Sequence, residues 1–481
     1  MKDIRIPHTM EHLIMDPDDV LKFIPRTGVV AFGGMAGTAL VKEVPEALSH
    51  YDGDLYLTVL TGGTTTSAFE YGLSLINVGR RYPAASGKIS REMANKGSLH
   101  LADYWLSEFS RLLRTGGIPQ ARKVDVAFIE STGITDDGII PSLSVDAVPA
   151  MVEAAQKIVV EVNISKPVMY GLHDIFLPRD REPIPISNVL DRVGEPVVKC
   201  PRDKIMGIIL TDRPESGAGA YSGVGPVELS IAEHIVEVLG EVVGEHRISR
   251  SYTLQPGAGP LASALLQRIK FRDVRVWSEA ITVDWVDSLG DKIDAISSSC
   301  IYTLRGQEKI LEDVYGELPS FLDRLVLRPY EITNRAEVIS RMNLISIQQA
   351  IEVDIYGNTN ITHVGGDIYN GVGGSGDFSR NASLTILALP SATSDGKISR
   401  IVPVCSHVDV PEHDIDFLVT ETGWADLRGL SPRERAEQII ENCVHERFRE
   451  PLSEYFEKAC RVGGHEPVSW KDAVEFREMM G

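Results

Sequence analysis

Two glycine-rich segments have the composition of loops that bind anions through the backbone. Residues 370–378 read Asn-Gly-Val-Gly-Gly-Ser-Gly-Asp-Phe, and residues 255–260 read Gln-Pro-Gly-Ala-Gly-Pro. Glycine tolerates positive φ and the close approach of a ligand, so the N–H groups of such loops can hold a phosphate or an oxyanion. The second segment precedes a stretch with helical spacing at 261–267, and a helix N-terminus favours an anion. A structural bend is an equally good interpretation of either segment, because neither matches the P-loop or the dinucleotide fingerprint.

Glu279 lies just after a predicted strand at 274–277, and Trp277 beside it could form an apolar wall. A carboxylate at a strand end can act as a nucleophile or as a base. It can also be a solvated surface charge or a helix cap, because most glutamates lie in contact with water. The residues alone leave these roles open.

Residues 406–414 contain His407, Asp409, Glu412 and His413, a density that is compatible with a metal site. The spacing fits no helical zinc pattern such as H-E-x-x-H, so a polar loop is the favoured interpretation. The chain has no G-x-S-x-G motif, which argues against an α/β-hydrolase triad. Its five cysteines are scattered and form no C-x-x-C pair, so buried structural thiols are expected.

Short apolar β-branched runs alternate with segments of helical spacing, which predicts a mostly parallel α/β sheet. Strands are predicted at 28–32, 55–60, 124–129, 158–162, 205–210, 274–277 and 384–389, and helical segments at 41–48, 148–156, 227–243 and 432–460. Residues 211–220 are rich in Gly, Pro and small side chains and are typical of a linker. Two α/β domains, 1–215 and 216–481, that meet at a cleft are the simplest arrangement.

The bulk composition excludes several classes of function. The 481 residues have a formal net charge of −20, which argues against general nucleic-acid binding. No apolar run approaches the ~20 residues of a membrane helix, and the N-terminal residues lack the apolar core of a secretory signal. The unpaired cysteines are typical of a reducing compartment, so a cytoplasmic location is expected.

Several longer motifs together resemble the acetyl-CoA hydrolase/transferase family. They lie at 42–45, 181–186, 192–194, 352–357, 370–382, 406–414, 420–423, 425–430 and 441–445, and so extend over nearly the whole chain. The resemblance implies two open CoA-transferase-type α/β domains, of the NagB/RpiA/CoA-transferase-like class, with the active site between them. The domain at 216–481 would contain the nucleophile and the CoA-binding loops.

The resemblance also implies roles for individual residues. The family's nucleophilic glutamate falls on Glu279, an active-site asparagine on Asn334, and a further catalytic glutamate on Glu421. Oxyanion and CoA contacts fall on two loops and a nearby lysine: Gly257, Ala258, Gly259, Asn370, Gly373, Gly374 and Lys397. Lys397 lies three residues beyond the position of the family's usual lysine. No metal ligand is implied, and coenzyme A enters as a substrate thioester rather than as a cofactor.

The implied function is exchange of CoA between a short-chain acyl-CoA and a free carboxylic acid such as acetate, propionate or succinate. The implied mechanism is a ping-pong exchange through a glutamyl-CoA thioester, and the implied assembly is a homodimer. The alternatives are an acyl-CoA hydrolase that uses the same glutamate and a non-catalytic CoA-binding protein. Pro256 and Pro260 lack an N–H, so an oxyanion donor at position 258 is kept while none can exist at 256 or 260. Departures at 81–85 and 103–107 predict a more apolar acyl pocket.

Overall fold

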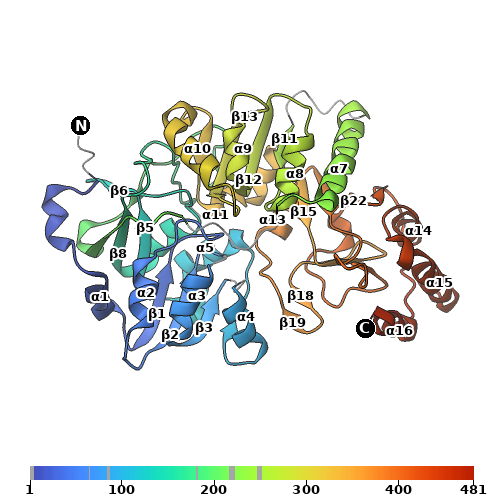
Figure 1. The fold of residues 1–481 in the computed structure, drawn as a ribbon, viewed down its shortest axis with the longest axis horizontal. Helices are drawn as coiled ribbons and strands as arrows, with labels where there is room; N and C mark the ends of the chain where they lie inside the picture. The colour runs from blue at the N-terminus through green and yellow to red at the C-terminus, as the bar shows by residue number, and fades with distance from the viewer. Residues whose placement is uncertain are drawn as a thin grey trace.

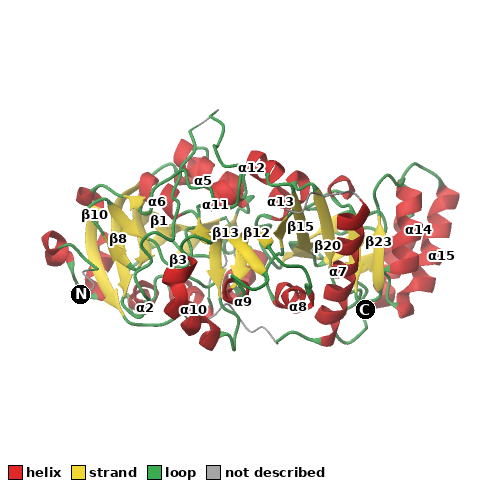
Figure 2. Cartoon of the chain, turned by 90° about the horizontal axis from the view of Figure 1, so that it is seen from above, coloured by secondary structure: helices red, strands yellow, loops and turns green. Residues whose placement is uncertain are grey.

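The computed structural model describes residues 5–63, 66–83, 87–179, 182–215, 223–245 and 252–480. The chain builds two large sheets that lie beside each other and are covered by helices (Figures 1 and 2). The predicted α/β class is confirmed. The predicted linker at 211–220 is described only up to residue 215, and the proposed boundary falls where that stretch ends.

The first sheet has seven strands in the order β10-β8-β5-β1-β2-β3-β4, all of them parallel. Its strands are β1 (Thr27–Phe32), β2 (Tyr56–Thr61), β3 (Asn77–Tyr82), β4 (His100–Leu101), β5 (Val124–Ser131), β8 (Ala155–Asn163) and β10 (Ile205–Thr211). The accompanying helices are α1 (Pro17–Val20), α2 (Glu43–Ser49), α3 (Ser67–Ser74), α4 (Lys88–Asn95), α5 (Leu106–Thr115) and α6 (Val148–Ala154). A small antiparallel sheet joins β6 (Gly133–Ile134), β7 (Gly138–Ile140) and β9 (Val198–Lys199).

The second sheet has the order β14-β13-β12-β11-β15-β20-β22-β23 and is parallel except for the last pair. Its strands are β11 (Thr253–Gln255), β12 (Val274–Thr282), β13 (Ile293–Tyr302), β14 (Leu325–Leu327), β15 (Leu344–Gln349), β20 (Leu384–Ala388), β22 (Phe417–Thr420) and β23 (Gly423–Asp426). The helices are α7 (Pro226–Glu245), α8 (Pro260–Arg268), α9 (Val283–Asp287), α10 (Glu308–Phe321), α11 (Tyr330–Thr333), α12 (Ala336–Arg341) and α13 (Ser375–Asn381). Small pairings add β16 (Glu352–Asp354), β17 (Thr359–Asn360) and β21 (Ile401–Val402), and the hairpin β18 (His363–Val364) with β19 (Asp367–Ile368).

Three helices end the chain: α14 (Pro432–Asn442), α15 (Glu446–Val462) and α16 (Trp470–Met480). They form the right-hand end of the molecule in Figure 1. The helical segment predicted at 432–460 is therefore two helices, and α14 begins with a capping box in which Ser431 and Glu434 satisfy each other's backbone N–H groups. Within the described residues, no helix combines the length and apolar character needed to cross a membrane.

The two sheets share one hydrophobic core, because buried residues of both belong to a single contact cluster. A loop from the first half also bonds directly to β13: the N–H of Val145 donates to the carbonyl of Ser299 at 2.9 Å. The boundary near residue 215 thus separates two sheets in sequence, while the folded halves are packed tightly against each other.

Several predicted boundaries differ from the structure by a few residues, and two of them show why. The helix predicted at 148–156 ends at Ala154, because β8 begins at Ala155, where it pairs with the first residue of β5. The strand predicted at 274–277 continues to Thr282, because β13 offers a parallel partner along that whole length. Glu279 consequently lies inside a strand rather than just after it.

Candidate active site

Glu279 lies near the C-terminal end of β12, in the middle of the second sheet, and is half-buried. The amide nitrogen Nδ2 of Asn334, just after α11, donates to its Oε2 at 2.5 Å. The hydroxyl of Thr333 donates to the Asn334 amide oxygen at 2.8 Å, which fixes the orientation of the amide. Trp277 adds a second link between strand and loop, since its indole N–H donates to the carbonyl of Thr333 at 2.8 Å. The structure thus brings together two residues that are 55 positions apart.

The glycine-rich segment 370–374 passes directly over this carboxylate. A Cβ built on Gly374 would lie 2.1 Å from Glu279 Oε2 and 2.3 Å from Asn334 Nδ2. A Cβ on Gly373 would lie 4.0 Å from Glu279 Oε1, and Gly373 also has a φ of +58°. Gly374 has an ordinary φ of −99°, so only the close approach requires glycine there.

The first half of the chain holds this glycine loop in place through residues 103–107. The N–H of Val372 donates to Asp103 Oδ2 at 2.7 Å, and the N–H of Leu106 donates to the carbonyl of Gly373 at 3.2 Å. The ring of Trp105 lies against Gly376, where a Cβ would come within 2.4 Å of it. The candidate site therefore lies where the two halves of the chain meet.

Asp377 is a second carboxylate of the site, and the sequence did not single it out. Its Oδ2 accepts from Asn334 Nδ2 at 3.1 Å and from the N–H of Ser107 at 3.2 Å, and its Oδ1 accepts from the Ser107 hydroxyl at 2.5 Å. Asn334 is thus held between two carboxylates. Asp377 follows the glycines of the motif directly, so its position next to the loop was the available signal.

Burial raises the pKa of the carboxyl groups in this site. The pKa of Glu279 is raised to about 7, mainly by burial and further by the charge of Asp377, although the Asn334 hydrogen bond opposes the shift. Burial likewise raises the pKa of Asp377 to about 6 and that of Asp103 to about 7. Glu279 is therefore close to half ionised at neutral pH, and its carboxylate is poorly solvated.

The second glycine loop follows β11, the strand next to β12. Gly257 and Gly259 have φ values of +71° and +95°, and the carbonyl of Ala258 accepts from Gln349 Nε2 at 2.8 Å. A Cβ on Gly257 would lie 3.0 Å from the carbonyl of Ile347, on β15. This loop is thus held against β15, at the same edge of the sheet as Glu279.

Three predicted residues lie outside the immediate surroundings of Glu279. Glu421 follows β22, four strand positions from β12, and its carboxylate accepts from the N–H of Ser391 at 2.8 Å and from its hydroxyl. Asn370 is exposed, and its backbone N–H donates to the carbonyl of Thr362 at 3.1 Å. Lys397 is 71% exposed and lies 3.6 Å from Asp395. Their predicted roles remain predictions.

His407 and Asp409 of the histidine-rich segment line a pocket of about 440 Å³, together with Tyr104, Trp105 and Val372. His407 Nε2 lies 3.1 Å from Asp409 Oδ1, and its ring centroid is 4.2 Å from that of His363. Among the described residues, no three His, Cys, Asp or Glu side chains are arranged to hold a metal ion. The pocket combines aromatic walls with carboxylates, and the more apolar acyl pocket stays a prediction.

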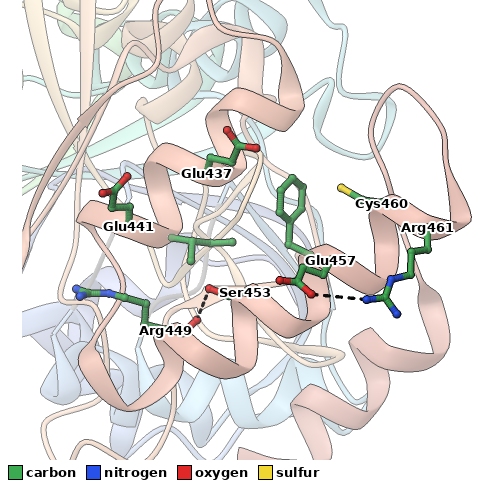
Figure 3. Close-up of a pocket in the computed structure, with 9 residues that line it drawn as sticks. Glu437, Glu441, Arg449, Ser453, Glu457, Cys460 and Arg461 are labelled. Carbon is green, nitrogen blue, oxygen red and sulfur yellow. Dashed lines mark hydrogen bonds and ion pairs between the residues drawn. The ribbon is translucent and has the colours of Figure 1, made fainter.

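A larger hollow of about 610 Å³ lies between α14 and α15, away from β12 (Figure 3). Its charged side chains lie along the two helices, and Arg461 pairs with Glu457 at 3.7 Å. All of its lining residues belong to α14 and α15, and Glu279 is not among them.

Comparisons with known proteins show the family of the chain. Residues 7–203 match the family described as acetyl-CoA hydrolase/transferase N-terminal domain, and residues 312–456 match the corresponding C-terminal domain. A succinyl-CoA:acetate CoA-transferase from Clostridium kluyveri is 36% identical over 97% of this chain and 89% of its own length. An acetyl-CoA hydrolase from Schizosaccharomyces pombe is 35% identical over 96% and 94%. A propanoyl-CoA:succinate CoA transferase from Escherichia coli is 33% identical over 94% of each chain.

Solved structures share the fold. RipA from Yersinia pestis aligns with a TM-score of 0.71 at 20% identity, over 94% of this chain and 98% of its own. A 4-hydroxybutyrate CoA-transferase from Porphyromonas gingivalis aligns with a TM-score of 0.63 at 20% identity, with the same coverage. At this level of identity the likeness supports the architecture, which is the one predicted.

Proposed function

Because the chain belongs to the acetyl-CoA hydrolase/transferase family, and is thus an enzyme of that family, we propose that it exchanges CoA between a short acyl-CoA and a free carboxylic acid through Glu279. The observation that supports this proposal is the surroundings of the carboxylate. Asn334 Nδ2 and the backbone of Gly374 both lie within contact distance of one carboxylate oxygen. Such a carboxylate is restrained in position and poorly solvated. It can attack the thioester as a nucleophile, and its acylated form can then be attacked by the CoA thiolate.

Covalent catalysis divides the exchange into easier steps. The Glu279 carboxylate attacks the thioester carbonyl of acyl-CoA, the C–S bond breaks, and an acyl-glutamyl anhydride and CoA thiolate result. The thiolate then attacks the glutamyl carbonyl, which releases the free acid and leaves a glutamyl-CoA thioester. A second acid runs the same steps in reverse. Burial of Glu279 removes water that would stabilise the free carboxylate, so the nucleophile is more reactive once ionised.

Asn334 supplies a donor for the charge that develops in the second attack. When the thiolate adds to the glutamyl carbon, negative charge builds on an oxygen of the Glu279 side chain, and Asn334 Nδ2 already donates to Oε2. A donor fixed before the reaction stabilises the transition state without reorganisation. The steps need acyl-CoA and an acid and use no metal. The homodimer and the cytoplasmic location stay predictions.

The direct test of this proposal is to trap the intermediate. The protein is incubated with acetyl-CoA, treated with borohydride and digested, and the peptide that contains residue 279 is analysed by mass spectrometry. Reduction of a thioester converts the Glu279 carboxyl to an alcohol, with the corresponding loss of mass. An unmodified peptide after turnover would contradict the covalent step.

Hydrolysis is the second candidate, because curated relatives of equal similarity are named acetyl-CoA hydrolases. Water would then attack the glutamyl-CoA thioester in place of the second acid. The two functions separate in one assay, release of free CoA from acetyl-CoA with and without an added acid. Transfer predicts that acetate, propionate or succinate accelerates consumption and that the acceptor's own CoA ester accumulates. If none of the added acids changes the rate of CoA release from acetyl-CoA, the enzyme is a hydrolase.

Replacing Asn334 by alanine is expected to lower kcat by about 10²–10³-fold, the usual effect of losing one oxyanion donor. KM for acetyl-CoA should change much less, because the amide contacts the reacting carboxyl rather than the CoA moiety. The matched control is Asn188→Ala, an exposed asparagine that lies on a different loop. Equal kcat values for the two variants would show that Asn334 does not stabilise the reaction.

The rate is expected to rise with pH as Glu279 ionises. Its pKa in the folded protein is raised to about 7, and the carboxylate is the attacking form, so kcat/KM should fall about tenfold per pH unit well below 7 and level off above it. The measurement is initial rate at low acyl-CoA from pH 5 to pH 9, with intact protein verified at each end. A profile that stays flat down to pH 5 would contradict this ionisation.

A further inference from the structure

Arg400 has a guanidinium group that the described part of the chain leaves without a partner. Its Nε is buried and has no hydrogen bond, and the side chain forms no ion pair with any described residue. Every other arginine side chain from position 350 onwards has a hydrogen bond or an ion pair; examples are Arg435 with Glu412 and Arg477 with Glu352. A partly buried cation with no ion pair is costly, and the more distant charge of Glu421 offsets only part of that cost, so an anionic ligand would supply the missing partner.

The position of Arg400 is fixed by Ser391, which follows β20. The N–H of Arg400 donates to the carbonyl of Ser391 at 2.9 Å, and Ser391 in turn donates its N–H and its hydroxyl to the Glu421 carboxylate. Burial lowers the pKa of Arg400, while the nearby charges of Tyr369 and Glu421 raise it. Both oxygens of Glu421 already accept from Ser391, the residue whose carbonyl accepts from the Arg400 backbone.

This place lies on the same edge of the second sheet as Glu279. The strands between them are β11 and β15, so β12 and β20 are three inter-strand spacings apart, roughly 14 Å. Figure 2 shows β12, β15 and β20 following one another along the sheet. The pantetheine arm of CoA has about the length of four extended residues, also roughly 14 Å. A CoA whose sulfur meets Glu279 could therefore cross the 256–259 loop and end beside Arg400.

We propose that Arg400 binds a phosphate group of the CoA moiety and thereby anchors the acyl-CoA for attack by Glu279. This inference rests on the proposed function and adds a residue to it. Arginine suits the role because its planar donors match phosphate oxygens and stay charged at every working pH. The anchor holds the thioester at the nucleophile, and binding energy from this remote group is used at the reacting centre. Glu421 then acts as a positioning residue, through Ser391.

The test compares ligands that keep or lack phosphates. Binding of CoA, dephospho-CoA and pantetheine is measured by calorimetry for the wild type and for Arg400→Gln, and KM is measured for acetyl-CoA and acetyl-pantetheine. We expect Arg400→Gln to weaken CoA binding by about 10–100-fold, the loss of a charge-assisted contact. Pantetheine binding should change less than about twofold, as should KM for the acceptor acid. Arg400→Lys, which keeps the charge, should recover part of the loss.

Dephospho-CoA identifies which phosphate is bound. If Arg400→Gln weakens the binding of dephospho-CoA as much as that of CoA, Arg400 contacts the diphosphate. If Arg400→Gln leaves the binding of dephospho-CoA unchanged, Arg400 contacts the 3′-phosphate. Either result supports the proposal. Equal weakening of all three ligands, or a rise only in KM for the acid, would overturn it.

Two controls keep the inference separate from other failures. Arg461→Gln removes an exposed arginine paired with Glu457 and should bind CoA as the wild type does. Thermal melting of each variant shows whether it is folded. If Arg400→Gln does not fold, the binding comparison is made with Arg400→Lys instead. Calorimetry with CoA requires no turnover. A wild-type protein without transferase or hydrolase activity would therefore contradict the proposed function. The calorimetric comparison of wild type and Arg400→Gln would still test the role of Arg400 in CoA binding.

Discussion

Glu279→Gln is expected to reduce CoA transfer by at least about 10⁴-fold, because the amide cannot form the anhydride or the thioester. The side chain keeps its size, and its carbonyl oxygen can still accept from Asn334 Nδ2. The fold and CoA binding should therefore persist. The measurement is kcat with acetyl-CoA and a panel of acids, together with the borohydride experiment, which should leave residue 279 unmodified.

The same substitution is expected to stabilise the protein at pH 8. The raised pKa of Glu279 means that the folded state favours the protonated acid, so its contribution to stability is present below about pH 4.5 and is lost as pH rises through about 7. Glutamine is neutral at all pH values, so the free energy of unfolding should increase at pH 8 by on the order of 2 kcal/mol and change little at pH 5. Chemical denaturation at both pH values measures this difference. A variant that is destabilised at pH 8 would show that Glu279 is not held in an environment unfavourable to its charge.

Gly374→Ala is expected to lower kcat by about 10³-fold or more. The added Cβ would lie 2.1 Å from Glu279 Oε2 and 2.3 Å from Asn334 Nδ2, far inside van der Waals contact, so one of the two must move. The backbone conformation of Gly374 is accessible to alanine, so the loop itself need not be strained. Displacement of the nucleophile or its donor by about 1 Å removes the geometry on which the reaction depends.

Gly316→Ala is the matched control for this substitution. Gly316 lies inside α10, and a Cβ there would meet nothing within 4 Å, so activity should be unchanged and the helix slightly more stable. Thermal melting of both variants separates loss of fold from loss of the site. A Gly374→Ala enzyme with normal kcat would show that the loop moves away from Glu279 before the reaction.

The order of strands and helices was largely predictable because it depends on local patterns. Buried parallel strands such as 205–210 and 384–388 are short, mostly apolar runs that the sequence pattern identifies directly. The glycine motif at 370–376 was also visible, since only glycine permits the approach seen at Gly374. The ends of elements were less predictable: the length of β12 depends on β13, a partner that follows it in the chain.

Glu279 and Asn334 could be proposed as partners from their motifs, yet their contact was decided by α11 folding over the end of β12. The contact of the segment 103–107 with Asp377 and the glycine loop was not predictable, because it joins the first half of the chain to the second. The position of Arg400 likewise depends on its backbone hydrogen bond to Ser391, beyond the end of β20. The sequence alone therefore determined the elements and the residue types of the chemistry, which are local properties. The tertiary structure decided which charges are buried together and which stay unpaired, because burial and distance depend on segments far apart in the chain.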